Sequence, residues 1–465
     1  MSRSQERLEV SLADVADLVR GVTYPKAEAR DQAVPGYVPM LRATNIQDSK
    51  LVLDADLVHI AERNVSHVQR LRPGDIVVAT SSGSKHLVGK SALLRSEWAG
   101  SFGAFCAAIR PKPNVEPRYL ASFLQSPSYW KQVGKKALGV NINNLRRGDL
   151  ETLTLPLPDL NNQHRIVAEI EKQFSRLDEA VAGLQRVKAN LKRYKAAVLQ
   201  AAVEGRLVPT EADIARREGR SYESGAQLLK RILETRRSQW QGKGKYKEPA
   251  APDTTDLPEL PEGWVWANCD AILTDIEAGA SFKCVERPPV DCETGVLKVS
   301  AVSWGVFDEA ESKTCIDPER VEEGFLVRKG DFLFSRANTI ELVGACVIVH
   351  QITKRLMLSD KTLRFSMSPY IEGRWLLSCL RSKLGRNEIE RLATGNQESM
   401  RNIGQDRIRQ IRVPLPPLAE QYRIDAEVDR LFSITHEAEA EVTVNLKRAL
   451  MLRQSVLTKL FDPPT

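Results

Sequence analysis

Two sets of polar side chains, far apart in the chain, have the chemistry needed to read nucleic-acid bases. The first set begins after a β-type run at residues 75–80 and continues near residue 145. Arginine can form two hydrogen bonds with a guanine edge, asparagine or glutamine can do so with adenine, and lysine can contact phosphate. The candidates in this set are Ser82, Lys85, Lys90, Asn141, Asn143, Arg146 and Arg147.

The second set lies at the corresponding place in the later part of the chain. It follows a second β-type run at residues 331–335 and resumes at residues 394–402. Loops rich in Gly, Asn, Ser and Arg on a rigid frame often hold residues that read a ligand, and they are also ordinary surface loops. The candidates here are Arg336, Asn338, Asn396, Gln397 and Arg401.

Motifs for catalysis or metal binding are weak. Asp462-Pro-Pro resembles the start of the Asp-Pro-Pro-Tyr motif of adenine methyltransferases, but Thr465 stands where the aromatic residue belongs. Asp291 with Glu311-Ser-Lys313 matches a nuclease metal site only over spacings that arise easily by chance. The histidines form no HxH or HExxH pair, and the cysteines form no CxxC pair. We therefore expect no catalytic residue and no metal ion in this chain.

Composition narrows the class of protein. A length of 465 residues suggests about three domains, and the net charge of +7 mildly favours a polyanionic partner. The seven cysteines are odd in number, which argues against a disulfide framework. The N-terminus lacks the apolar core of a signal peptide, and the longest apolar runs are far shorter than the ~20 residues that cross a bilayer. We expect a soluble, cytoplasmic protein.

The elements that must position the two polar sets are duplicated. Pro, Pro, Leu, Gln, Arg and Ile recur in one register at residues 154–166 and 412–424, a shift of 414 − 156 = 258 residues. Upstream, Leu71-Arg-Pro-Gly-Asp matches Val327-Arg-Lys-Gly-Asp. Between these anchors the two copies share little sequence. Readers of two different targets would diverge in this way, and so would a duplication that drifted neutrally.

Each copy of the Pro-x-Pro motif leads into a long helical pattern. Apolar residues recur there at heptad spacing with Lys, Arg and Glu between them, which is typical of a coiled coil. The alternative is an amphipathic helix packed on its own domain. Val187 and Tyr194 take intermediate positions, and Thr435 and Asn445 interrupt the second pattern. The residues expected to pair are Ile170, Leu177, Leu184, Leu191, Val198, Ile424, Val428, Leu431, Val442, Leu452 and Val456.

These patterns predict an α+β fold in which a globular domain precedes each long helix. Short β-type runs, turn signals and helical stretches alternate within each domain. The basic stretch at residues 230–247 could contact nucleic acid, but such stretches are more often solvated helix and linker. The expected parts are a first domain at 1–155, a first long helix at 156–204, a connection and linker at 205–261, a second domain at 262–413 and a second long helix at 414–465.

Taken together, these features resemble the specificity (S) subunits of type I restriction–modification systems. The resemblance covers essentially the full length. Besides the duplicated Pro-x-Pro-x-Leu-x-x-Gln-x-Arg-Ile segments, it rests on Gly205-Arg-Leu-Val and Leu260-Pro-Glu-Gly-Trp. It implies two target-recognition domains, each reading one half of a bipartite, asymmetric DNA site. It also implies that two long antiparallel coiled-coil helices join these domains and set the spacer.

The resemblance further implies partners and cofactors. The partners are double-stranded DNA, two methyltransferase subunits that modify adenine at N6, and restriction (motor-nuclease) subunits, with no membrane. S-adenosylmethionine, ATP and magnesium belong to those partners, and this chain is itself non-catalytic. Two other classes stay open. A self-contained DNA-modifying enzyme would methylate DNA without partners, and a coiled-coil protein scaffold would bind without sequence preference.

Overall fold

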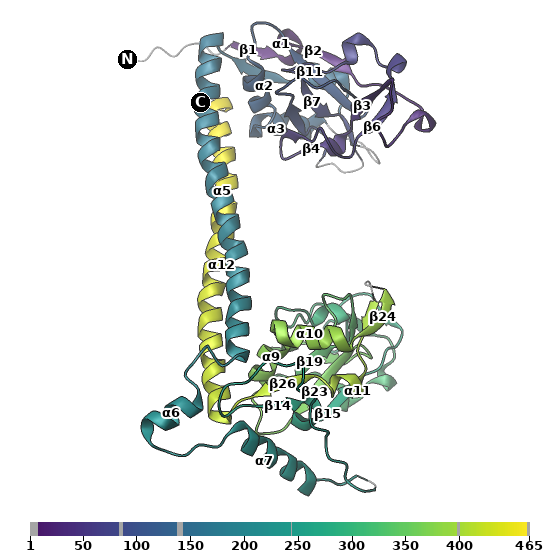
Figure 1. The fold of residues 1–465 in the computed structure, drawn as a ribbon. Helices are drawn as coiled ribbons and strands as arrows, with labels where there is room; N and C mark the ends of the chain where they lie inside the picture. The colour runs from purple at the N-terminus through teal and green to yellow at the C-terminus, as the bar shows by residue number, and fades with distance from the viewer. Residues whose placement is uncertain (1–7, 83–86, 137–142, 243, 398–399, 463–465) are drawn as a thin grey trace. The chain divides into compact units, whose positions relative to one another are not determined.

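The computed structural model describes the chain apart from residues 1–7, 83–86, 137–142, 243, 398–399 and 463–465 (Figure 1). It divides into two compact units. Unit 1 comprises Met1–Arg186 with Val442–Thr465, and unit 2 comprises Val187–Glu441. Each unit therefore combines one globular domain with a part of each long helix.

Unit 1 is built from helices and short strands. Its helices are α1 (Leu12–Val15), α2 (Pro117–Phe123), α3 (Pro127–Lys136) and α4 (Arg147–Glu151), with the first part of α5 (Leu160–Val203) and the last part of α12 (Leu418–Phe461). Its strands are β1 (Leu8–Ser11), β2 (Ala16–Arg20), β3 (Tyr37–Leu41), β4 (Ile46–Gln47), β5 (Lys50–Leu51), β6 (Val58–Ala61), β7 (Ile76–Ala79), β8 (Ser81–Ser82), β9 (Ser91–Leu93), β10 (Ser101–Phe102), β11 (Cys106–Pro111), β12 (Asn143–Asn144) and β13 (Thr154–Leu157).

A four-stranded antiparallel sheet in the order β2-β11-β7-β9 forms the centre of unit 1. Strand β7 is fully buried, as its Ile-Val-Val-Ala sequence predicts. Successive side chains of a strand point to opposite faces. Ile76 and Val78 accordingly pack in one core with residues of α2 and α3. Val77 and Ala79 pack in another, with residues of β3 and β4. The sheet is therefore covered on both faces.

The last turn of α12 completes the core of unit 1. Phe461 is buried there. Its ring centroid lies 5.3 Å from that of Tyr119 and 5.6 Å from that of Phe123, both in α2. Tilted and edge-to-face aromatic pairs at this separation add to the free energy gained by apolar burial. The end of the chain is thus a structural part of the first domain.

Unit 2 has the same kinds of element. Its helices are α6 (Glu211–Glu218), α7 (Gly225–Ser238), α8 (Cys269–Ile272), α9 (Gly373–Arg381), α10 (Lys383–Leu392) and α11 (Gln405–Ile408), with the rest of α5 and α12. Its strands are β14 (Val265–Asn268), β15 (Leu273–Ala278), β16 (Cys284–Val285), β17 (Thr294–Leu297), β18 (Ser312–Cys315), β19 (Phe332–Ser335), β20 (Ala337–Asn338), β21 (Cys346–Ile348), β22 (Arg355–Met357), β23 (Thr362–Met367), β24 (Thr394–Gln397), β25 (Met400–Asn402) and β26 (Arg412–Leu415).

The central sheet of unit 2, β15-β23-β19-β21, repeats that of unit 1 strand for strand. The duplicated Gly-Asp motif explains part of this. The glycine before each aspartate has a positive φ, 93° in one copy and 95° in the other, which favours glycine. Asp75 pairs with Arg110 at 2.7 Å, and Asp331 pairs with Arg364 at 3.2 Å. A buried carboxylate is costly unless it is paired, so the buried Asp75 requires Arg110, and the half-buried Asp331 keeps the same kind of partner.

The glutamine of the duplicated Pro-x-Pro motif attaches each long helix to its domain. The side-chain oxygen of Gln163 accepts the N–H of Glu116 at 2.8 Å, and that of Gln421 accepts the N–H of Glu372 at 2.9 Å. Each side-chain amide also donates to the carbonyl of the second proline, at 2.8 and 3.1 Å. Both glutamines are buried. Each glutamine thus satisfies a backbone N–H at the N-terminus of α2 or α9 and, at the same time, the carbonyl of the proline that follows β13 or β26. This double requirement explains the fixed spacing of the motif.

The long helices begin later than the sequence predicted. We expected them to start at residues 156 and 414, but those prolines lie in β13 and β26, which pair with β1 and β14. Proline is tolerated in such two-stranded pairs because they leave an edge free. The residue before a proline is also disfavoured in helical conformation. The helices therefore begin only after the second proline, at Leu160 and Leu418.

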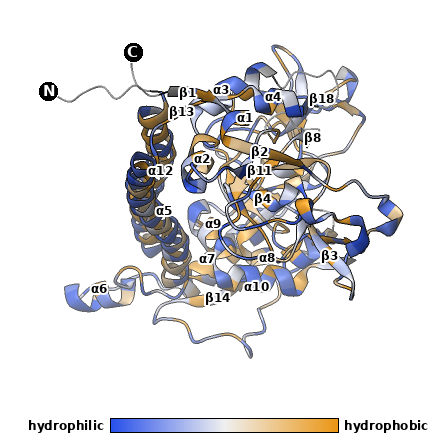
Figure 2. Ribbon diagram, turned by 90° about the horizontal axis from the view of Figure 1, so that it is seen from above, coloured by the Kyte–Doolittle hydropathy of each residue, from blue (hydrophilic) through white to orange (hydrophobic). Residues whose placement is uncertain are grey.

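Within each unit, α5 and α12 lie alongside each other (Figure 1), and Figure 2 shows apolar and polar residues alternating along both helices. Within unit 1, Arg453 of α12 pairs with Asp178 of α5 at 2.7 Å. Within unit 2, Lys195 of α5 pairs with Glu439 of α12 at 2.6 Å. Because the later α5 residue meets the earlier α12 residue, the helices run in opposite directions.

The seam between the helices departs from the heptad prediction near its end. Leu452 is 54% exposed. The neighbouring Arg453 faces α5 instead, with its guanidinium 4.1 Å from the centre of the Phe174 ring. In a straight α-helix, residues seven apart are rotated by about 20° relative to one another. A heptad position that faces the partner helix at one end therefore points away from it several heptads later. Among the other expected residues, those buried are Ile170, Val198, Ile424, Val428 and Val442, and those half-buried are Leu177, Leu184, Leu191, Leu431 and Val456.

Three other positions of the helical pattern also differ from expectation. Val187 and Tyr194 are each 45% exposed, so they do not take over the intermediate seam positions. Thr435 is buried, because its hydroxyl donates to the carbonyl of Phe432 at 2.8 Å and leaves its methyl group for packing. A threonine in an apolar seam is therefore tolerated here.

Candidate nucleic-acid interface

The polar segments singled out in the sequence meet at short strand pairs. In unit 1, β8 pairs antiparallel with β12, which places Ser82 opposite Asn143. In unit 2, β20 pairs antiparallel with β25, which places Asn338 opposite Arg401, and β25 also pairs with β24. We call β8 with β12, and β20 with β24 and β25, the polar edge of each unit. Segments that are distant in the sequence are thus brought together in each copy.

Matching backbone hydrogen bonds hold the two polar edges. In unit 1, the N–H of Thr80 donates to the carbonyl of Phe105 at 2.8 Å, and its carbonyl accepts the N–H that follows β12 at 2.8 Å. In unit 2, Arg336 makes the same two bonds, to the carbonyl of Lys361 and from the N–H that follows β25, both at 2.9 Å. The backbone frame is therefore duplicated while the side chains on it differ.

The candidates of unit 1 differ in their surroundings. Ser82 and Lys90 are half-buried, and Arg146 and Arg147 are exposed at the start of α4. Arg147 donates to Glu151 at 2.7 Å, so one carboxylate already shares its charge. Lys85 and Asn141 lie outside the described residues, and only the backbone of Asn143 is described.

In unit 2, Arg336, Asn338 and Arg401 are half-buried on the polar edge. Arg336 donates to the side-chain oxygen of Asn402 at 3.4 Å. The Nε of Arg401 is buried and has no hydrogen-bond partner among the described residues. A buried N–H without a partner is costly, so the Nε of Arg401 is an unsatisfied donor at this edge. For the remaining candidates, Asn396 and Gln397, only the backbone is described.

Sequence reasoning missed Phe105 and Lys361, whose carbonyls anchor the polar edges. Each is the third residue of a turn, the first just before β11 and the second just before β23. The turns are closed by N–H···O bonds of 2.9 and 3.2 Å. The sequence signal for this pair is the distance between the two copies. Phe105 and Lys361 are 361 − 105 = 256 residues apart, as are the two motif aspartates, at 331 − 75 = 256.

Sequence reasoning also missed a basic cavity beside the polar edge of unit 2. It has a volume of about 510 Å³, and its lining includes Lys298, Lys313, Lys361 and Phe282. Glu286 pairs with Lys298 at 3.9 Å and with Lys313 more closely. Lys361 is exposed at this site. Asp360 also lines the cavity, so its three ammonium groups stand against two carboxylates and leave a small excess of positive charge.

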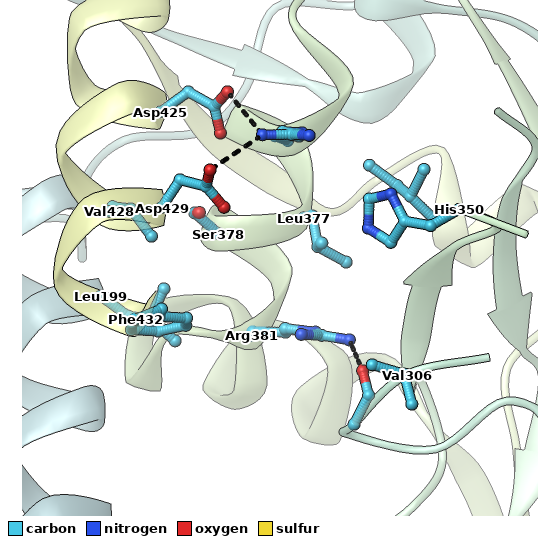
Figure 3. A pocket seen from close by; sticks show the side chains of 13 residues that line it. Leu199, Val306, His350, Leu377, Ser378, Arg381, Asp425, Val428, Asp429 and Phe432 are labelled. Carbon is cyan, nitrogen blue, oxygen red and sulfur yellow. Dashed lines mark hydrogen bonds and ion pairs between the residues drawn. The ribbon is translucent and has the colours of Figure 1, made fainter. Parts of the chain in front are cut away.

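A second cavity of unit 2, of about 260 Å³, marks where the domain meets its long helix (Figure 3). Arg374 of α9 lies 3.6 Å from Asp425 and 3.7 Å from Asp429, both on α12. Unit 1 has a corresponding pair between α2 and α5, in which Arg118 lies 3.3 Å from Glu171. Together with the buried glutamines, these ion pairs attach each domain to its helix.

Asp425 should make the stability of unit 2 depend on pH. Burial raises its pKa to about 6, although the nearby Arg374 lowers it, and Glu372 and Asp429 contribute to the rise. The folded state then binds a proton that the unfolded state has released, so stability falls as pH rises from about 4 to about 6. We expect Asp425→Asn to raise the free energy of unfolding at pH 7 by on the order of 1 kcal/mol, after allowing for solvent screening.

Calorimetric unfolding of both proteins between pH 4 and pH 8 measures this effect. The gain should shrink towards pH 4, where the wild-type carboxyl is protonated. Asp429→Asn is the matched control, because its side chain is 68% exposed. Parallel pH curves for wild type and Asp425→Asn would contradict the assignment.

Other reactive groups give no second candidate site. All seven cysteines are free thiols. Burial raises the pKa of Cys106 to about 12 and that of Cys346 to about 11, which makes both poor nucleophiles. Among the described residues, no three His, Cys, Asp or Glu are grouped so as to hold a metal ion. None of the described helices is long and apolar enough to span a bilayer.

Comparisons with known proteins identify similar chains. Residues 6–188 match the family model described as "Type I restriction modification DNA specificity domain". The specificity subunit of the type I restriction enzyme EcoKI, from Escherichia coli (strain K12), is 29% identical over 454 residues, which are 97% of this chain and 87% of the relative. The StySPI specificity subunit from Salmonella potsdam is 29% identical over 458 residues, with the same two coverages.

A solved structure has a similar fold. It comes from work on the "complex assembly and conformational transition of the type I R-M system". One of its chains superposes with a TM-score of 0.61 over 97% of this chain and 96% of its own length, at 18% sequence identity. The arrangement of two α+β domains with long helices is therefore shared with a known structure.

Proposed function

We propose that the chain is a specificity subunit of a type I restriction–modification system and selects the DNA sequence on which such a complex acts, as its similarity to such subunits supports. Each domain reads one half of a bipartite, asymmetric site through its polar edge. The domains correspond to residues 1–155 and 262–413. The connection at 205–261 and the two long helices join them and set the spacer between the half-sites.

The observation that carries this proposal is the duplicated polar edge. The same backbone hydrogen bonds support both edges, and the side chains displayed on them differ between the copies. A shared frame with exchangeable side chains is what two readers of different sequences require, because base edges are distinguished by donor and acceptor pattern. Neutral drift after duplication does not by itself explain why polar and basic groups collect at the same edge in both copies.

Catalysis in this proposal belongs to partner subunits. Two methyltransferase subunits use S-adenosylmethionine to methylate adenine at N6, and motor-nuclease subunits use ATP and magnesium. This chain supplies specificity and docking. In unit 1, α12 leaves four apolar side chains 41–69% exposed, Val444, Leu450, Met451 and Leu452, and a methyltransferase subunit would cover them.

A genome-wide map of adenine methylation tests the proposed function. Cells carrying this chain with its methyltransferase should show one bipartite asymmetric motif, and cells carrying the methyltransferase alone should lack it. Methylation by the purified chain without partners would instead indicate a self-contained enzyme. Binding to DNA without sequence preference, in the assembled complex, would indicate a scaffold.

The exposed arginines at the start of α4 allow a quantitative test. The logarithm of the DNA-binding constant falls with the logarithm of salt concentration, by about 0.9 per neutralised phosphate. We expect Arg146→Ala to flatten this slope by up to about 0.9 in the assembled complex. Arg147→Ala should change it less, because Arg147 already bonds Glu151. If Arg146 reads a guanine instead, its loss costs about 1–3 kcal/mol and relaxes one base of the motif.

Binding isotherms between 50 and 300 mM salt, on the mapped motif and on a scrambled duplex, give both readouts. Glu151→Ala is the matched control, because it frees Arg147 and should enlarge the effect of the Arg147 substitution. An unchanged slope and an unchanged motif in the double alanine variant would remove both arginines from the interface.

A further inference from the structure

We propose that the position shared by Phe105 and Lys361 determines specificity, and that Phe105 contacts the 5-methyl group of a thymine in the major groove. This inference rests on the proposed function, because it assigns a reading residue to the polar edge of unit 1.

Phe105 is held rigidly beside the polar edge. Its carbonyl accepts the N–H of Thr80 at 2.8 Å and that of Ser81 at 3.3 Å. The residues on either side of the turn, Phe102 and Cys106, are almost completely buried. The turn therefore cannot swing, and the ring projects from a fixed point next to β8. A fixed point of attachment is what a base contact requires, since the contact depends on position.

The ring itself is left in solvent. Its exposed fraction is 70%, which is the highest of the large apolar side chains described in unit 1. Burial of a phenylalanine side chain is favourable, so an exposed ring on a rigid turn forgoes most of that gain in the isolated chain. Contact with a ligand would recover it.

The neighbours of the ring define the ligand chemistry. The adjoining strand pair carries Ser81, Ser82 and Asn144, which are of the side-chain types that bond base edges or phosphates in protein–DNA complexes. Among these polar groups, an apolar ring can distinguish a base by its methyl group, which thymine alone presents in the major groove. Insertion between two bases is the other use of an apolar side chain on DNA, but it occurs mainly in the minor groove.

The second copy shows that this position varies on a constant frame. There the same carbonyl belongs to Lys361, which accepts the N–H of Arg336 at 2.9 Å and is exposed beside the basic cavity. An ammonium group at this point contacts phosphate or a guanine edge rather than a methyl group. The two copies thus place an apolar and a cationic group at one equivalent point.

The test uses the assembled methyltransferase complex and duplexes that carry the mapped motif. Replacing each thymine of the first half-site by uracil, one at a time, removes only the methyl group. We expect one of these replacements to weaken DNA binding by the wild-type complex about threefold to tenfold. The same replacement should leave DNA binding by the complex with Phe105→Ala unchanged. Phe105→Leu should retain most of the preference. Val68→Ala is the control, because Val68 is a 56% exposed apolar residue in the short 3-10 helix His67–Gln69 of unit 1.

Three outcomes would overturn the inference. The first is a half-site that contains no thymine. The second is that every uracil replacement affects wild type and Phe105→Ala equally. The third is that wild type shows no thymine preference and Phe105→Ala abolishes a DNA distortion seen by 2-aminopurine fluorescence. The last would identify a wedge between bases. The proposed function fails separately, if the wild-type complex shows no motif at all.

Discussion

Exchanging the first domain for that of a relative with a different target should change one half of the methylated motif and leave the other half intact. The exchanged segment is residues 1–155, which contains the whole polar edge of unit 1. Among the residues that the structure describes, the backbone bonds of the polar edge of unit 2 all join residues of that unit. Sequencing that detects N6-methyladenine across a genome would read both halves at once. We expect every methylated site to carry the new sequence in that half of the motif, because the exchanged domain replaces the specificity of that half.

The contacts of α5 and α12 with the first domain determine how the exchange should be made. Gln163 bonds the backbone N–H of Glu116, which any residue at that position supplies. Phe461 packs on the rings of Tyr119 and Phe123, so the donor relative should carry aromatic residues at both positions. The reciprocal exchange of residues 262–413 is the control and should change only the other half. A chimaera that altered both halves or neither, while folded and able to methylate, would contradict modular reading.

The motifs that were visible in the sequence are those in which one residue satisfies several buried groups. Gln163 must sit five residues after Pro158 because it bonds both the carbonyl of that proline and the start of α2. Asp75 needs a preceding glycine with positive φ and an arginine from another strand. Such requirements leave a spacing that recurs in both copies. The repeat and the helix-plus-domain arrangement could therefore be predicted.

Other features depend on residues that meet only in three dimensions. The pairing of β8 with β12 joins two-residue strands, which are too short to show a period in the sequence. Phenylalanine is by type most often a core residue, so its sequence gives no sign that Phe105 lies 70% exposed on a turn. The phase of the second helix could not be read from heptads alone, because Arg453 packs on an aromatic ring where Leu452 was expected. In each case, the structure depends on a contact or a side-chain direction that only the folded chain shows.

Lengthening both long helices should move the preferred spacer of the DNA site. Seven residues inserted between 186 and 187 in α5, and seven between 441 and 442 in α12, lie between the two ion pairs and keep the antiparallel register. One heptad adds about 10 Å, or about three base pairs at ~3.4 Å each. It rotates the helix by only about 20°, whereas three base pairs turn the duplex by about 100°. We expect the original spacer to be lost and affinity for the longer spacer to be weak.

Inserting three heptads into each long helix should restore the strong DNA binding that one heptad removes. They add about 32 Å, or roughly nine base pairs, which is close to one full turn of the duplex. The second half-site then faces the same side again, so strong binding should return at a spacer about nine base pairs longer. A library of duplexes with spacers from zero to twenty base pairs, selected by the assembled complex, measures both shifts. Insertion into α5 alone is the control, because it breaks the register of Lys195 with Glu439 and of Arg453 with Asp178. Full affinity for the original spacer in the three-heptad variant would mean that the helices do not set the distance.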